Sequence, residues 1–223
     1  MKSILTASLV PVLLVLTSAF QEKAAAVQAP EAADPKAIAQ QLPSYPLTTC
    51  PISHEGLDAM GKPLDLMHEG RLVRLCCKGC VKKFKQDPAV VLKTIDEAVI
   101  QAQKDGYALK TCPVSGEELG GMGEPMSYVH GTRLVKLCCK NCVEGFKKDP
   151  AKAMAKVDAA LIAAQKATYP LKTCLVSGEE IKDEGFDHLY GTRLTRFCCE
   201  KCAAKFDAEP AKFLGKLDAA KKN

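Results

Sequence analysis

The chain has 223 residues, with 31 lysines and arginines against 26 aspartates and glutamates, and a formal net charge of +5. These charges are spread along predicted helices with no basic patch interleaved with aromatics, so we expect no nucleic-acid partner. The sequence also lacks a phosphate-binding loop, a Ser-His-Asp set and a pair of catalytic carboxylates. We therefore expect a protein that is not an enzyme.

Residues 1–19 have the pattern of a secretory signal peptide: a basic tip, an apolar run over 4–16 and a small-x-small site ending at Ala19. We expect cleavage after Ala19, with Ala26 as the alternative site. The apolar run is shorter than the about 20 residues that a membrane span needs, although an uncleaved interfacial helix is the alternative interpretation. The sequence thus predicts an exported protein, periplasmic or secreted, with no membrane span in the mature chain.

Residues 20–44 consist mainly of Ala, Gln, Glu, Lys and Pro. Such a segment buries too little apolar surface to offset its ordering entropy. We expect a flexible tether here, with a short helix around 36–42.

The rest of the chain is an internal repeat. Cys50, Cys112 and Cys174 are spaced by 62 residues (112 − 50 and 174 − 112). A fixed period indicates several copies of one supersecondary unit. We expect beads on a string rather than one continuous core. The predicted repeats span residues 45–104, 107–166 and 169–221.

Each repeat contains signals for a small α+β unit. In the first, runs at 65–68 and 71–75 flank a turn, and the second run alternates as a half-buried strand does, which predicts a β-hairpin. A cysteine cluster then opens a short helix carrying Phe84. Asp87 and Pro88 follow in the N-cap and N1 positions of a longer helix. The predicted fold is three tandem treble-clef-like beads, each with a cysteine turn, a hairpin, a short helix and a longer helix.

All twelve cysteines belong to the repeats, four to each. A core of this size seldom supplies more than about 3–5 kcal/mol, so small modules commonly add disulfides or a metal. We take every thiol as a candidate metal ligand. The candidates are Cys50, Cys76, Cys77 and Cys80; Cys112, Cys138, Cys139 and Cys142; and Cys174, Cys198, Cys199 and Cys202.

The spacing by itself favours Cys77 and Cys80 as two of the ligands in the first repeat. Cys77 and Cys80 lie one helical turn apart at a helix N-terminus, which favours thiolate, and Cys50 on a turn can close over the same point, as in a treble-clef zinc site. Ser53 stands where the second knuckle cysteine is usual, and Cys76 offers the missing sulfur. Neighbouring strand residues point to opposite faces, so Cys76 and Cys77 share one ion only across a bend.

Cys50, Cys76 and Cys80, followed by Phe84 and an Asp-Pro helix start, resemble the YHS/TRASH domains, small cysteine modules associated with trafficking, sensing and resistance to heavy metals such as copper and mercury. The resemblance implies a three-cysteine site in each repeat, and Cys77 is additional to the family's pattern. The equivalents it implies are Cys112, Cys138, Cys142 and Phe146, then Cys174, Cys198, Cys202 and Phe206.

Three functions stay open. In the first, each repeat binds one zinc or copper ion for sequestration or delivery, with a metal-handling protein as partner; three thiolates suit Cu(I) as well as zinc, whereas four favour zinc. In the second, export favours a disulfide-stapled structural or interaction protein without metal. The third is a thiol–disulfide oxidoreductase using Cys77 and Cys80, although the βαβ scaffold of that class is not evident.

Two further pairs of residues recur. His68 and His130 are equivalent, but the third repeat has Tyr190 there, so we expect hairpin residues rather than ligands. Met60 and Met122 are also equivalent, and we expect them to fill the core.

Overall fold

The structure is a computed structural model that describes residues 34–182 and 185–220. The predicted signal peptide and most of the predicted tether lie outside the described residues. Each repeat is an antiparallel two-stranded hairpin followed by two helices, which confirms a small mixed α+β fold. The elements are β1 (Leu64–His68), β2 (Arg71–Leu75), α2 (Lys78–Gln86) and α3 (Pro88–Gln103); β3 (Met126–His130), β4 (Arg133–Leu137), α4 (Asn141–Lys148) and α5 (Pro150–Lys166); and β5 (Phe186–Tyr190), β6 (Arg193–Phe197), α6 (Glu200–Ala208) and α7 (Pro210–Ala220).

The first hairpin closes through a two-residue turn. His68 pairs with Arg71, and the intervening Glu69 and Gly70 both have positive φ, 49° and 74°. Positive φ at both positions matches the twist of the flanking strands, as in type I′ turns. The register that this turn sets places Val73 in the core at 0% exposure.

The long helices begin where the sequence predicts. The Asp87 side chain accepts a hydrogen bond from the Ala89 amide, with Pro88 at the first helical position. Buried side chains then recur every four residues in α3, at Val91, Ile95 and Val99. Helical spacing therefore gives this helix one apolar face directed at the core of its own repeat.

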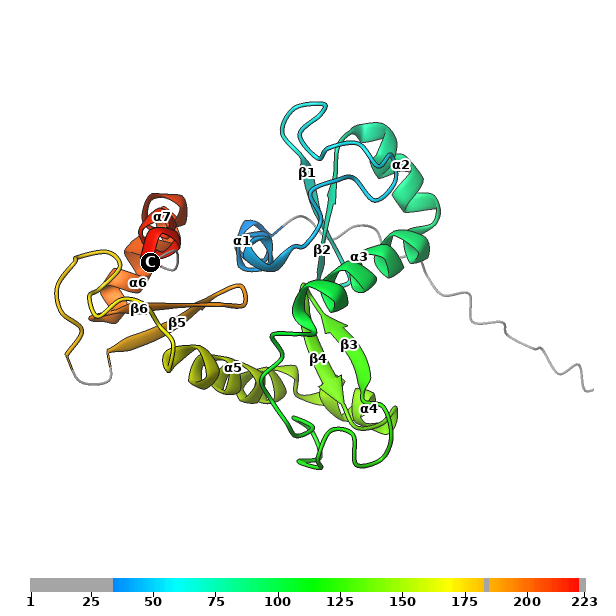
Figure 1. The fold of residues 1–223 in the computed structure, drawn as a ribbon. Coiled ribbons are helices and arrows are strands. Elements are labelled where there is room, and N and C mark those ends of the chain that lie inside the picture. The colour runs from blue at the N-terminus through cyan, green and yellow to red at the C-terminus, as the bar shows by residue number, and fades with distance from the viewer. Residues whose placement is uncertain (1–33, 183–184, 221–223) are drawn as a thin grey trace, which may run out of the picture.

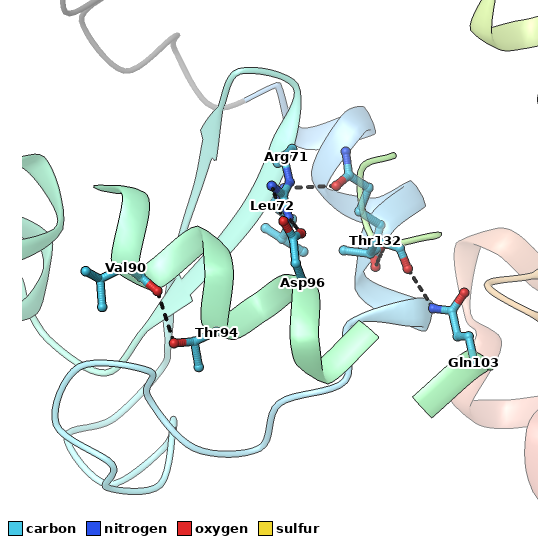
Figure 2. Close-up of polar contacts among 8 residues, drawn as sticks. Arg71, Leu72, Val90, Thr94, Asp96, Gln103 and Thr132 are labelled. Atoms are coloured by element: carbon cyan, nitrogen blue, oxygen red, sulfur yellow. Dashed lines mark hydrogen bonds and ion pairs between the residues drawn. The ribbon is translucent and has the colours of Figure 1, made fainter. Parts of the chain in front are cut away.

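The C-terminal end of α3 packs on the next repeat. Val129 and Leu134 of the second hairpin are buried in the same core cluster as Val99. Gln103 Nε2 donates to the Thr132 carbonyl at 2.8 Å (Figure 2), and its Oε1 accepts from the Leu134 amide at 2.9 Å. The repeats thus interlock through shared helices, and the structure differs in this respect from the expected beads on a string.

The glutamine contact occurs three times at the period of the repeat. Gln41 bonds Gly70 O and Leu72 N in the same way that Gln103 bonds the second hairpin. Gln165 repeats the contact with Thr192 O and Leu194 N on the third hairpin.

The N-terminal segment supplies the first of these glutamines. It forms α1 (Pro35–Gln41) and the 3₁₀ helix η1 (Leu42–Ser44), so the last part of the predicted tether is helical and packs on the first hairpin. The expected short helix around 36–42 is present. α1 therefore takes the place, for the first hairpin, that α3 and α5 take for the next two.

All three hairpin turns approach this segment, and α1 lies between the three hairpins in Figure 1. Thr132 Oγ1 donates to the Gln41 carbonyl at 3.0 Å and lies 2.6 Å from Ser44 Oγ. On the third turn, a Cβ at Gly191 would lie 2.8 Å from the Pro43 carbonyl, so this contact requires glycine. The cysteine-bearing ends of the hairpins consequently point away from the centre on separate arms.

Replacing Gln103 with alanine is expected to lower the free energy of unfolding by about 2 kcal/mol, because Thr132 O and Leu134 N would both lose their partner. Urea denaturation would measure the change. The matched control is Gln101→Ala on an exposed face of the same helix, for which we expect a change within about 0.5 kcal/mol. Equal destabilisation by both variants would contradict the role of this contact.

Candidate metal centre

Three cysteine sulfurs converge in each repeat. In the first, the Sγ atoms of Cys50, Cys76 and Cys80 all lie within 4.8 Å of one another, and the three residues are 0%, 5% and 5% exposed. The same grouping recurs in the other two repeats. Its members there are Cys112, Cys138 and Cys142, and Cys174, Cys198 and Cys202. The structure thus brings together nine of the twelve predicted ligands in three groups.

Three different elements bring these sulfurs to one point. Cys50 sits on a tight turn, where its amide donates to the Glu55 carbonyl at 2.7 Å and its carbonyl accepts from the His54 amide at 2.9 Å. Cys76 directly follows β2, and Cys80 lies in the first turn of α2. The end of the hairpin therefore places the Cys76 sulfur between Cys50 on the turn and Cys80 on α2.

The fourth cysteine lies beside the group and not in it. Cys77 is the N-cap of α2 with extended backbone angles, φ −156° and ψ 166°. Successive side chains of an extended backbone point in opposite directions, so Cys76 faces inward while Cys77 is partly exposed. Cys77 Sγ still lies 3.7 Å from Cys80 Sγ. Cys139 and Cys199 have the corresponding places and are partly exposed and exposed.

A serine stands behind each group. Ser53 Oγ lies 3.3 Å from Cys76 Sγ, and Ser115 Oγ lies 3.3 Å from Cys138 Sγ. In the third repeat, the Ser177 amide points at Cys174 Sγ at 3.5 Å. Sequence reasoning treated this serine as a missing ligand, although its recurrence three residues after the first cysteine was a visible signal. Its contacts show a residue that supports the sulfurs.

The thiols in one group differ strongly in acidity. Burial disfavours the thiolate of Cys50, but the amides of Ser53 and Cys76 and the Ser53 hydroxyl bond the sulfur and together lower its pKa to about 6. Burial raises the pKa of Cys80 to about 12, and contacts with the other sulfurs add to this effect. Cys112 and Cys174 likewise have a pKa of about 6. Each group therefore holds a thiolate at neutral pH, before any ion arrives.

We expect metal binding by the first group to depend more steeply on pH below about pH 6 than above it. Above that value Cys50 is already a thiolate; below it an ion must displace a proton, which weakens binding by about a further tenfold per pH unit. Cys80 releases its proton on binding on both sides of this point, so its contribution does not change there. Competition with a chromophoric chelator across this range would measure the slope.

Ser53→Ala should raise the pKa of Cys50, because the hydroxyl donor is lost. The pH below which metal binding weakens more steeply should rise with it. Ser127→Ala, at an exposed position of β3, is the control and should leave the profile unchanged. A profile with one constant slope in the native chain would refute this assignment of the thiolate.

The donor set fits a soft metal ion. Three sulfurs form each group, with no carboxylate or imidazole among its members. His68 and His130 instead lie edge-on against Phe84 and Phe146, each with ring centroids 5.2 Å apart, as expected for hairpin residues. Soft thiolate sets select ions such as Cu(I) and zinc.

The expectation that Met60 and Met122 fill the core is wrong. Their side chains are 73% and 65% exposed. Both follow the first cysteine of their repeat in a loop rich in glycine with positive φ, at Gly61, Gly120 and Gly123. The loop therefore carries its thioether into solvent.

Two further findings bear on the alternatives. The twelve cysteines all lie within the described residues, and none of them is joined in a disulfide. Within residues 34–182 and 185–220, no helix combines the length and apolar character needed to cross a membrane.

No family model, curated protein or solved structure matches this chain.

Proposed function

We propose that this is an exported, non-enzymatic protein in which each repeat binds one soft or borderline metal ion, zinc or copper, for sequestration or delivery. The observation that carries the proposal is the threefold recurrence of three cysteine sulfurs within 4.8 Å of one another, all of them buried except that of the partly exposed Cys198. The resemblance of the repeats to YHS/TRASH domains supports the same assignment, and a metal-handling protein would be the partner.

The number of donors favours copper over zinc in the three-sulfur site. Zinc in closed protein sites is almost always bound by four ligands in a tetrahedron. Only three sulfurs group together, so zinc would need Cys77 or a water molecule as its fourth ligand. Cu(I) is selected by soft sulfur donors, and the buried trio of Cys50, Cys76 and Cys80 supplies these without another residue.

The arrangement of the arms supports storage or transfer rather than catalysis. The groups share no residue and lie at the ends of separate hairpins, so each would fill independently. Linking several sites in one chain raises their local concentration. The hairpins are all antiparallel, whereas the oxidoreductase alternative needs a βαβ unit around its two cysteines.

Elemental mass spectrometry and a thiol count under denaturing conditions, on protein recovered from its native compartment, would test the proposal. We expect about one zinc or copper ion for each of the three groups, and free thiols once the ion is chelated. Protein without metal and without free thiols would instead support the disulfide-stapled alternative. The identity of the ion in the loaded protein would also distinguish zinc from copper directly.

A further inference from the structure

In the first repeat, the partly exposed Cys77 lies next to the buried sulfur group. Cys50, Cys76 and Cys80 are at most 5% exposed, whereas Cys77 is partly exposed and lies 3.7 Å from Cys80 Sγ. An ion leaving the buried group can therefore meet Cys77 before it meets solvent. The Cys77 sulfur lies over the first turn of α2, because a Cβ at Gly79 would be 3.7 Å from it.

This face of α2 is basic. Residues three and four positions apart share a helix face, so Lys82 and Lys83 follow Gly79 one turn later on the face over which the Cys77 sulfur lies. Lys78 adjoins Cys77 in the sequence. All three lysines are exposed, and α2 contains no acidic residue. The outward route from the first site thus opens beside several positive charges.

The other repeats carry less of this charge. Where the first repeat has Lys82, the second has Glu144, which pairs with Lys147 at 2.9 Å, and the third has Ala204. In place of Lys78 the third repeat has Glu200, although it has Lys201 and Lys205 where the first repeat has Gly79 and Lys83. The three sites therefore have the same arrangement of sulfurs but differ in the charges beside it.

We propose that Cys77 and the lysine face of α2 form a port through which the first site exchanges its ion with a small, negatively charged thiol. The inference rests on the proposed function, since it assumes that the buried group holds an ion. The lysines attract the carrier's negative groups and raise its local concentration beside Cys77. The first repeat has the most positive charge beside its opening, so it is the arm that exchanges ions with anionic thiols fastest.

The exchange proceeds by ligand substitution. The Cys77 sulfur bonds to the ion as the bond from the ion to Cys80 breaks, and the carrier's thiolate then displaces Cys77 and the remaining cysteines. The carrier's thiol gives up one proton for each bond it forms, and each cysteine released as a thiol takes up one. The ion keeps its oxidation state, so the step needs no oxidant or reductant.

The test uses two backgrounds of the full chain. Cys112→Ser with Cys174→Ser leaves only the first site, and Cys50→Ser with Cys112→Ser leaves only the third as a matched control. Each protein is loaded with Cu(I) without oxygen, its copper content is measured, and stopped-flow absorbance then follows removal of copper by dimercaptosuccinate, which carries two carboxylates, or by uncharged dithiothreitol.

We expect the ratio of the two removal rates to favour the charged dithiol by about tenfold more at the first site than at the third. Lys82→Gln with Lys83→Gln should abolish this excess without changing the copper content. Cys77→Ser should slow removal by both dithiols by about tenfold, at the lower end of what the loss of a group supporting metal ligands does. The equivalent Cys199→Ser at the third site shows whether the sulfur acts where Lys78 and Lys82 have no equivalent.

Equal rate ratios at the two sites, or an unchanged rate in Cys77→Ser, would overturn the port while leaving metal binding intact. A first-site background that takes up neither copper nor zinc would instead overturn the proposed function and the port together. The copper and zinc contents of each variant therefore separate the two failures.

Discussion

Replacing Cys50 with serine is expected to lower the metal content of the chain from three ions to two. The substitution removes one of three donors, and it removes the thiol whose pKa of about 6 makes it the thiolate present at neutral pH. Cys112→Ser and Cys174→Ser should each have the same effect on their own repeat. Because the groups share no residue, the ions in the other two repeats should remain. Native mass spectrometry of loaded protein would count the ions directly.

The control for this series is Met60→Ser, in the same repeat as Cys50. Its side chain is 73% exposed and belongs to no sulfur group, so three ions should remain. Loss of all three ions from a single cysteine variant would show one shared cluster in place of three separate sites. An unchanged count in Cys50→Ser would remove Cys50 from the site.

Phe84→Ala should have the largest effect on stability. Phe84 is 2% exposed, belongs to the core cluster of the first repeat and meets the edge of His68. Truncating a buried phenylalanine costs about 3–5 kcal/mol, as much as the core of a module this small supplies. We expect the first repeat to unfold, β2 to lose hydrogen-exchange protection, and the first ion to be lost with Cys80.

The interlocking of the repeats makes this result more specific. Val129 and Leu134 belong to the same cluster as Phe84, so part of the protection of β3 and β4 should also fall. Val90→Ala, at a position 63% exposed on α3, is the control and should change the free energy of unfolding by no more than about 0.5 kcal/mol. Hydrogen exchange that changed only within the first repeat would contradict the shared core.

The local elements could be predicted from the sequence because their signals are local. The run Arg71–Leu75 predicts a strand, and β2 lies there, although Leu72 and Val73 are both buried, so the strand is covered on both faces and is not half-buried as expected. Asp87 followed by Pro88 starts a helix wherever its apolar face can be buried. The cysteine spacing by itself favoured Cys77 with Cys80, and only the resemblance to the YHS/TRASH pattern implied the group of Cys50, Cys76 and Cys80 that the structure has. Each of these features depends on residues a few positions apart, and the fixed period showed that they recur.

Contacts between distant segments decided the rest. Gln41, Gln103 and Gln165 look like ordinary polar residues on exposed helix faces, and only the approach of the next hairpin turn gives them backbone partners. Cys76 joins the group in place of Cys77, which the spacing favoured, because the extended backbone after β2 turns the two side chains in opposite directions. A pattern fixes which residues can share a face, whereas the packing of separate segments determines what that face meets.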